Sequence, residues 1–225
     1  MALDTNLDQA QEPELAKELK QEQTLRTEIY LVLSALFRSA PSEEVIDFLK
    51  TLDIEASESA MQKAWIAIQQ AATESNREAL EDEYQDLFIG IGRGEIVPFG
   101  SWHRTGAMME KPLAEIRHDL ELLGIERDDQ VKEPEDHIAA LCEVMAMLTG
   151  EEEEALQQAV FNKHLGPWFN SFTRQLESAE SANFYKSAAQ LCEAFLTLEQ
   201  VRFSVNTKSS KHKLKIDVKN VTDYE

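Results

Sequence analysis

The chain has 225 residues, which is enough for one large domain with a buried core, and 43% of them are hydrophobic, too many for a disordered protein. A formal net charge of −20 argues against nucleic acid as a partner, because binding phosphates requires a basic stripe that is absent here. No apolar run approaches the roughly 20 residues of a membrane span, and residues 1–22 are acidic and amide-rich, unlike a secretory signal. We therefore expect a cytoplasmic protein without stable membrane insertion.

The N-terminal part of the chain predicts four helices behind an acidic lead-in. Residues 1–24 carry few apolar groups and are expected to be disordered. From Leu25 onward apolar residues recur at helical spacing, with Leu25 itself at a core position, and Ser42 is a typical N-cap. Ser75 followed by Glu78 forms a capping-box pattern. The four helices are expected over residues 25–40, 42–52, 57–73 and 75–90.

Glycines are concentrated in the next segment. Five of the eight glycines lie between Gly90 and Gly106, so residues 90–103 are predicted to form an irregular connection. A dinucleotide fingerprint needs G-x-G-x-x-G between a strand and a helix, whereas here a helix precedes G-x-G-x-G, so turn glycines are favoured over a nucleotide loop. Long loops without secondary structure are uncommon unless they are functional, so this connection remains a candidate site.

The C-terminal part predicts further helices behind a charged hinge at residues 125–133. Pro134 is typical of a first helical position, so Asp136 and His137 are expected on the first turn of a helix over residues 134–149. Leu198 occupies a core position of the last helix. One helix is expected before the hinge, over residues 107–123. After the hinge, the expected helices cover residues 134–149, 151–163, a stretch opened by Pro167, and 181–201.

Residues 202–225 differ in character from the rest. They carry six Lys or Arg against three Asp or Glu, and Leu214, Ile216 and Val218 alternate with polar residues as in a short strand. A lone strand is marginally stable, so a mobile basic tail is favoured, and folding back on the acidic body is one state open to it. The predicted fold is therefore all-α: an irregular bundle of about eight or nine helices, with helical subdomains at 25–124 and 134–201.

No catalytic constellation is apparent. A carboxylate-bridged di-iron bundle requires two Glu-x-x-His helices, and only Glu115 with His118 fits that spacing. A mononuclear metal site from His137 with Glu133 or Asp136 lacks further ligands at a recognisable spacing. The two cysteines, Cys142 and Cys192, lie in apolar helical patterns and are expected to be buried free thiols.

We therefore expect no enzyme activity, no cofactor and no metal. Two interpretations of Asp136 and His137 remain. In one they cap and pack their own helix; in the other a carboxylate there receives a cationic group, for which arginine is best suited because it binds bidentately.

Four stretches, in this order and spacing, resemble the TorD/DmsD family of cytoplasmic redox-enzyme maturation chaperones. They are EYQDLFIG at 83–90, PFGS at 98–101, EPEDH at 133–137 and HLGPW at 164–168. The resemblance runs from about residue 25 to residue 200. It departs from the family pattern at Gly100, where many members have Glu, at His103, where many have an aromatic residue, and at Arg38.

The resemblance implies an all-helical fold of two subdomains and a non-catalytic role. Family members bind the twin-arginine signal peptide and the apo form of a molybdenum-cofactor oxidoreductase, and they delay export until the cofactor is inserted. Carried over by position, Asp136 and His137 match residues implicated in leader binding, and Phe99, Ser101 and Trp102 match the loop beside them. Glu133 joins this predicted site as a neighbouring carboxylate.

Other functions and states remain open on the sequence. A helical adaptor that ignores the leader is one alternative, and a nucleotide- or metal-dependent enzyme is another. The chain is expected to be a monomer or a helix-swapped dimer exchanging at the hinge. N-oxide reductases, sulfoxide reductases and formate dehydrogenases are all candidate clients.

Overall fold

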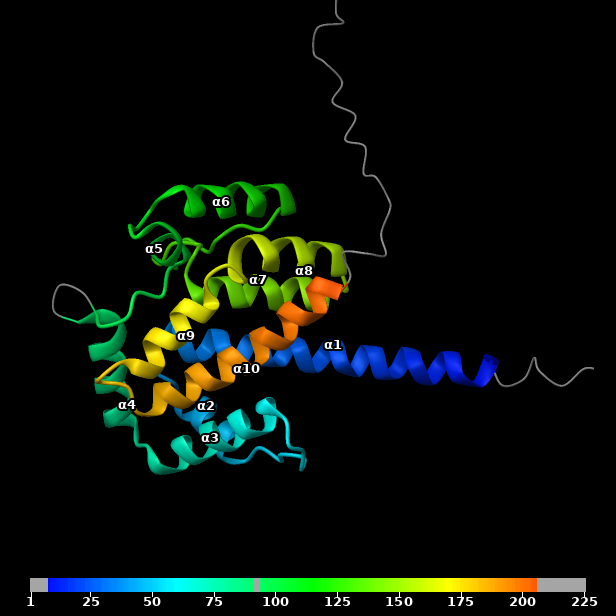
Figure 1. The fold of residues 1–225 in the computed structure, drawn as a ribbon, viewed down its shortest axis with the longest axis horizontal. Coiled ribbons are helices and arrows are strands. Elements are labelled where there is room, and N and C mark those ends of the chain that lie inside the picture. The colour runs from blue at the N-terminus through cyan, green and yellow to red at the C-terminus, as the bar shows by residue number, and fades with distance from the viewer. Residues whose placement is uncertain (1–7, 91–93, 206–225) are drawn as a thin grey trace, which may run out of the picture.

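The computed structural model describes residues 8–90 and 94–205, and within them it consists of ten α-helices and two π-helical turns, without a β-strand (Figure 1). The predicted all-α class is confirmed. The α-helices are α1 Asp8–Arg38, α2 Glu43–Lys50, α3 Ala60–Glu74, α4 Arg77–Tyr84, α5 Gly100–Thr105, α6 Lys111–Leu123, α7 Ile138–Gly150, α8 Glu154–Val160, α9 Phe169–Ser178 and α10 Phe184–Val205. The π-helical turns are Gln85–Ile89, which continues α4, and Phe161–Leu165, which continues α8.

The first helix begins well before the position expected from the apolar pattern. Residues 1–24 were expected to be a disordered lead-in, but α1 already runs from Asp8. The segment is rich in Glu, Lys, Gln, Ala and Leu, which are strong helix formers, so propensity extends the helix beyond its packed face. Figure 1 shows this part of α1 projecting from the body. Residues 1–7 lie outside the described residues.

Side-chain caps fix several helix starts. Ser42 accepts the N–H of Val45 at the start of α2, as expected, although the contact is long at 3.4 Å. Asn76, rather than the expected Ser75, caps α4 by accepting the N–H of Ala79 at 3.0 Å. Ser75 is instead the C-cap of α3, where its N–H donates to the carbonyl of Ala71. Both types cap well, so sequence alone cannot choose between adjacent candidates.

The core is continuous. One hydrophobic cluster contains Leu33 and Phe37 of α1, Met145 of α7, Phe172 of α9 and Leu191 of α10. In Figure 1, α1 and α10 cross the middle of the molecule, with α2 and α3 on one side and α5 and α6 on the other. Residues on both sides of the predicted hinge at 125–133 share this cluster, and the division into subdomains stays a prediction.

A buried ion pair ties α1 to α10. The guanidinium of Arg26 donates from Nε to Oε1 of Glu199 at 2.8 Å and from a terminal nitrogen to Oε2 at 2.6 Å. Tyr30 donates its hydroxyl to the same carboxylate at 2.9 Å, and Gln157 accepts from Arg26 at 2.9 Å. The free-energy cost of burying these charges is offset because each charged group has hydrogen-bond partners.

Two leucines that were expected in the core are exposed. Leu25 of α1 is 54% exposed and Leu198 of α10 is 55% exposed. Arg26 beside Leu25 and Glu199 beside Leu198 are buried, so the neighbouring helices cover one side of α1 and α10 at these positions and leave the side that carries the leucine exposed. Periodicity alone therefore assigned both leucines to the wrong environment.

Two further boundaries also differ. Helix α5 begins inside the segment predicted to be irregular, and α6 begins at Lys111 rather than near residue 107. Among the described residues no helix has the length and apolarity to cross a bilayer. The tail was predicted at residues 202–225, but residues 202–205 belong to α10. Residues 206–225, with the predicted strand, lie outside the described residues.

Candidate functional site

Two of the sequence motifs pair with each other through their backbones. The N–H of Gly100 donates to the carbonyl of Asp136, and the N–H of Ile138 donates to the carbonyl of Pro98, both at 2.9 Å. Phe99 and His137 are thereby an antiparallel bridge pair, and their rings meet edge to face with centroids 4.9 Å apart. We call residues 98–102 together with 133–138 the motif junction. It unites the six residues that the sequence assigned to one site.

Asp136 is an internal group of this junction. Helix α7 begins only at Ile138, so the expectation that Pro134 opens the helix and that Asp136 lies on its first turn is wrong. The backbone of Asp136 is occupied by its pairing with residue 100, and this keeps it out of the helix. Its Oδ2 accepts the N–H of Ser101 at 2.7 Å, so the carboxylate satisfies a free donor in the first turn of α5.

Two polar atoms of the junction are left without a partner. Asp136 and Ser101 are both buried. The second carboxylate oxygen of Asp136, Oδ1, and the hydroxyl of Ser101 have no hydrogen-bond partner among the described residues. Buried acceptors of this kind are uncommon and costly, so the junction retains an acceptor capacity that the rest of the described chain does not use.

His137 caps α7 in its neutral form. Its Nδ1 accepts the N–H of Ala139 at 3.1 Å, so the ring proton must reside on Nε2. Burial and the nearby positive charge of Arg38 lower the pKa of His137 to about 3. At neutral pH the ring is therefore an uncharged cap, which agrees with the packing interpretation of this residue.

The carboxylates around the junction are unequally available. Glu135 is held by two guanidinium groups, with Arg117 Nε at 2.8 Å and Arg127 Nε at 3.4 Å. The carboxylate of Glu133 is partly exposed and has no hydrogen bond or ion pair to any described residue. Burial and, to a lesser degree, the charge of Glu133 raise the pKa of Tyr84 to about 12. Glu133 is therefore the available acidic group of the predicted cluster.

A second charged group beside the junction was not predicted. Glu143 pairs with Arg38 at 2.5 Å and accepts the hydroxyl of Ser34 at 3.0 Å, and its side chain is 45% exposed. Tyr84 donates its hydroxyl to the carbonyl of Arg38 at 2.9 Å, at the end of α1. A sequence signal for Glu143 did exist, because it is the charged residue within the otherwise uncharged stretch of α7.

The departures from the family pattern at Gly100 and His103 share one neighbour, Trp168. A Cβ added to Gly100 would lie 3.0 Å from Nε1 of Trp168, so a larger residue there requires the indole to move. His103 stacks on Trp168 with centroids 5.2 Å apart, and its Nε2 donates to the carbonyl of Val97 at 2.8 Å. Burial lowers the pKa of His103, so it packs as a neutral aromatic ring. Trp168 in turn donates to the carbonyl of His164, within the fourth motif.

Over residues 8–90 and 94–205, no three His, Cys, Asp or Glu side chains are grouped so that they could hold a metal ion. Glu115 of the single Glu-x-x-His pattern lies near Lys111 at 3.3 Å and Arg104 at 3.7 Å.

Comparison with known families decides the assignment. The model of the nitrate reductase delta subunit family, which includes the TorD proteins, matches residues 54–174, more than half of the chain. The chain belongs to this family. The matched range contains the whole motif junction, so the TorD-type resemblance expected from the four motifs is confirmed.

Two proteins with similar sequences carry the same name. Chaperone protein TorD of Vibrio cholerae is 27% identical over 205 residues, which cover 81% of this chain and 93% of that protein. Chaperone protein TorD of Vibrio vulnificus is 25% identical over 209 residues, covering 82% and 97%. The expectation of a maturation chaperone of the TorD family, rather than an enzyme, agrees with these names.

A solved structure has the same fold. A proposed redox enzyme maturation protein from Archaeoglobus fulgidus superposes with a TM-score of 0.53 over 78% of this chain and 93% of that chain, at 24% identity. At this level of identity the likeness concerns the fold.

Proposed function

We propose that this TorD-family chain is a cytoplasmic chaperone that binds the twin-arginine signal peptide and the apo form of a molybdenum-cofactor oxidoreductase. It would assist cofactor insertion and hold back export of the client until insertion is complete. The observation that carries the proposal is the motif junction. The backbone pairing of residues 98–100 with 136–138 joins a segment with partly exposed aromatic residues to the segment that carries the available carboxylate of Glu133.

The charge of the chain supports a cationic ligand. The net charge of −20 attracts arginine-rich segments and speeds their encounter in a salt-dependent way. At the junction, Glu133 offers a partly exposed carboxylate without a partner among the described residues. An arginine can bind such a carboxylate through two parallel charge-assisted hydrogen bonds.

The six predicted site residues then divide into two roles. Glu133 is the contact for an arginine, and the partly exposed rings of Phe99 and Trp102 contact the apolar part of the leader. Asp136, His137 and Ser101 are buried and act as positioning residues, since they hold the segment that carries Phe99 and Trp102 against the start of α7. The unpartnered Oδ1 of Asp136 is a further acceptor that an arginine can use if the segment at 98–102 moves aside.

Calorimetry with a synthetic twin-arginine leader tests this assignment. Glu133→Gln should weaken binding by about tenfold, because it replaces a charge-assisted hydrogen bond with a neutral one. Glu126→Gln is the matched control, since Glu126 is an exposed carboxylate in the same connection between α6 and α7. A leader in which both arginines are replaced by lysine should bind the natural chain more weakly than the twin-arginine leader does. The Glu133→Gln variant should bind the two leaders with equal affinity.

The competing adaptor function predicts a different pattern. An adaptor would bind the client apoprotein equally with and without its leader, and neither Glu133→Gln nor the lysine leader would change the affinity. That result would remove leader recognition while leaving membership of the family untouched.

A further inference from the structure

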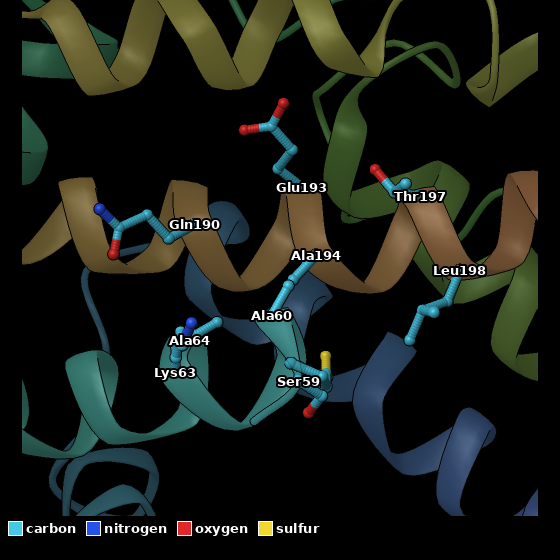
Figure 2. A pocket seen from close by; sticks show the side chains of 10 residues that line it. Ser59, Ala60, Lys63, Ala64, Gln190, Glu193, Ala194, Thr197 and Leu198 are labelled. Carbon is cyan, nitrogen blue, oxygen red and sulfur yellow. The ribbon is translucent and has the colours of Figure 1, made fainter. Parts of the chain in front are cut away.

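A groove lined largely by apolar side chains lies at the start of α3, away from the motif junction. It consists of two adjoining hollows of about 510 and 560 Å³, which share Ser59 and Met61 in their walls. We call this the α3 groove. Figure 2 shows the first hollow, with Ser59 and Ala60 at the start of α3 facing Leu198 of α10. The second hollow extends between α1 and the connection from α2 to α3, and Trp65 lies in its wall.

The apolar side chains that line the groove are exposed to solvent. Leu25, Phe48 and Leu198 line it and are 54%, 47% and 55% exposed, although periodicity assigned Leu25 and Leu198 to the core. Leu25 lies one turn from buried Ile29, and Leu198 lies one turn from buried Phe195, so the apolar stripes of α1 and α10 continue from the core into this groove. Such an adjoining set of exposed apolar side chains is typical of a surface that is covered by another segment.

The second hollow is also acidic. Glu28, Asp53 and Glu55 line it, and none of the three has an ion pair with any residue that the structure describes. Lys63 is the cation in the wall of the first hollow, while Glu193 stands on α10 with its carboxylate directed away from α3. The matching occupant therefore combines apolar side chains with several positive charges.

Residues 206–225 of this chain have that composition and follow directly from α10. They contain five lysines against three acidic residues, and Leu214, Ile216 and Val218 alternate with Lys213, Lys215 and other polar residues. In an extended segment, alternation directs the apolar side chains to one side and the lysines to the other. Lysine stems can lie along apolar walls while their ammonium groups reach carboxylates at the rim.

The segment also starts close enough to the α3 groove to reach it. Leu198 lines the groove, and seven residues of helix, about 10 Å, separate it from the end of α10 at Val205. From Val205 to Leu214 an extended chain spans up to about 30 Å, ample for a return. Because the segment is tethered, even weak docking is favoured by a local concentration in the millimolar range.

We propose that residues 206–225 dock into the α3 groove of the same molecule, with Leu214, Ile216 and Val218 on its apolar walls and the lysines toward Glu28, Asp53 and Glu55. This intramolecular cover is independent of leader recognition at the motif junction. It would keep an apolar groove of the chaperone closed when no other segment competes for it.

Amide hydrogen exchange in the connection between α2 and α3 reports the docking. The backbone N–H groups of residues 53–58 donate no hydrogen bond to any described residue, so their protection depends on what covers them. The full chain should exchange there about fivefold more slowly than a chain that ends after Val205. Lys213→Glu with Lys215→Glu in the full chain should remove the protection. The matched control, Lys213→Arg with Lys215→Arg, should keep it because the charge is unchanged.

Three outcomes would overturn the proposal. Equal exchange in the full and shortened chains would mean that the groove receives an external partner or none. Protection that grows with protein concentration would assign the groove to a second copy of the chain. Protection that moves to residues 98–102 or 133–138 would place the segment on the motif junction instead.

Discussion

Replacing Asp136 should destabilise the protein, and the choice of replacement should decide how much. Asp136 is buried, and its Oδ2 accepts the N–H of Ser101 at 2.7 Å. A charge-assisted hydrogen bond of this kind contributes roughly 1.5–3 kcal/mol, and loss of a helix cap costs about 0.5–2 kcal/mol. These describe the same contact, so Asp136→Ala should lower the free energy of unfolding by about 2–3 kcal/mol.

Asp136→Asn should behave differently. The amide oxygen can accept the same N–H, and the neutral side chain removes the cost of burying a charge, so the free energy of unfolding should stay within about 1 kcal/mol of the natural chain. Ser101→Ala is the matched control. It removes a hydroxyl that has no partner among the described residues but keeps the backbone N–H that Asp136 binds.

Urea unfolding followed by circular dichroism measures these differences. In a chain of this size, 2–3 kcal/mol also corresponds to a fall in Tm of roughly 4–12 °C. If Asp136→Ala were as stable as the natural chain, the carboxylate would not be holding the junction together. If Asp136→Asn kept its stability but lost leader binding, the carboxylate would contact the leader directly, and the assignment of Asp136 to positioning alone would be refuted.

Three further results are expected. Because the pKa of His137 is about 3 in the folded chain and about 6.5 when unfolded, its contribution to stability is complete above pH about 6.5 and falls as the pH drops toward 3. His137→Asn keeps an N-cap but cannot be protonated, so the free energy of unfolding should change less steeply across that window. Glu83 accepts the N–H groups of Asn183, Phe184 and Tyr185 at the start of α10, so Glu83→Ala should cost about 2 kcal/mol in urea unfolding. Glu199→Gln should cost about 3 kcal/mol because it leaves Arg26 buried without its counter-charge, whereas Arg26→Met combined with Glu199→Leu should recover most of that loss.

Each of these results has an internal control. The pKa of His103 and that of His164 are also lowered, in both cases mainly by burial. In His137→Asn the free energy of unfolding should therefore still depend on pH, but less steeply than in the natural chain. An unchanged slope would contradict the neutral cap. Glu81→Ala, at an exposed ion pair on the same helix as Glu83, should cost less than about 1 kcal/mol. A double variant of Arg26 and Glu199 no more stable than Glu199→Gln would show that the pair stabilises more than it costs.

The helical class was predictable because the apolar residues that form the core recur at helical spacing. Phe37, Phe172 and Leu191 lie within stretches predicted to be helical, and all three are fully buried. Leu25 and Leu198 carry the same periodic signal but are exposed. Periodicity defines a face of a helix, whereas burial depends on which sides of that helix its neighbours cover, and that is a property of the packed molecule.

The grouping of the two motifs was predictable from the sequence, but its geometry was not. The motifs placed residues 98–102 and 133–137 in one site, and the structure pairs them. Pro134 gave a misleading signal for a helix start, because the backbone at residues 136 and 138 bonds to residues 98–100 instead. Local propensity contains no term for a partner 35 residues away. The same limitation left both interpretations of Asp136 and His137 open on the sequence, whereas the structure buries both side chains, with Asp136 bonded to Ser101 and His137 capping α7.

The buried pair between Arg26 and Glu199 also sets an order of events during synthesis. The two residues are separated by 173 positions, so the ribosome delivers α1 long before the carboxylate that neutralises its guanidinium. Until α7 and α10 have emerged, the apolar face of α1 lacks its main packing partner and its buried counter-charge, and contacts between such distant segments form slowly. A growing chain of this chaperone is therefore itself exposed to aggregation, and its first helix is among the last parts to be secured.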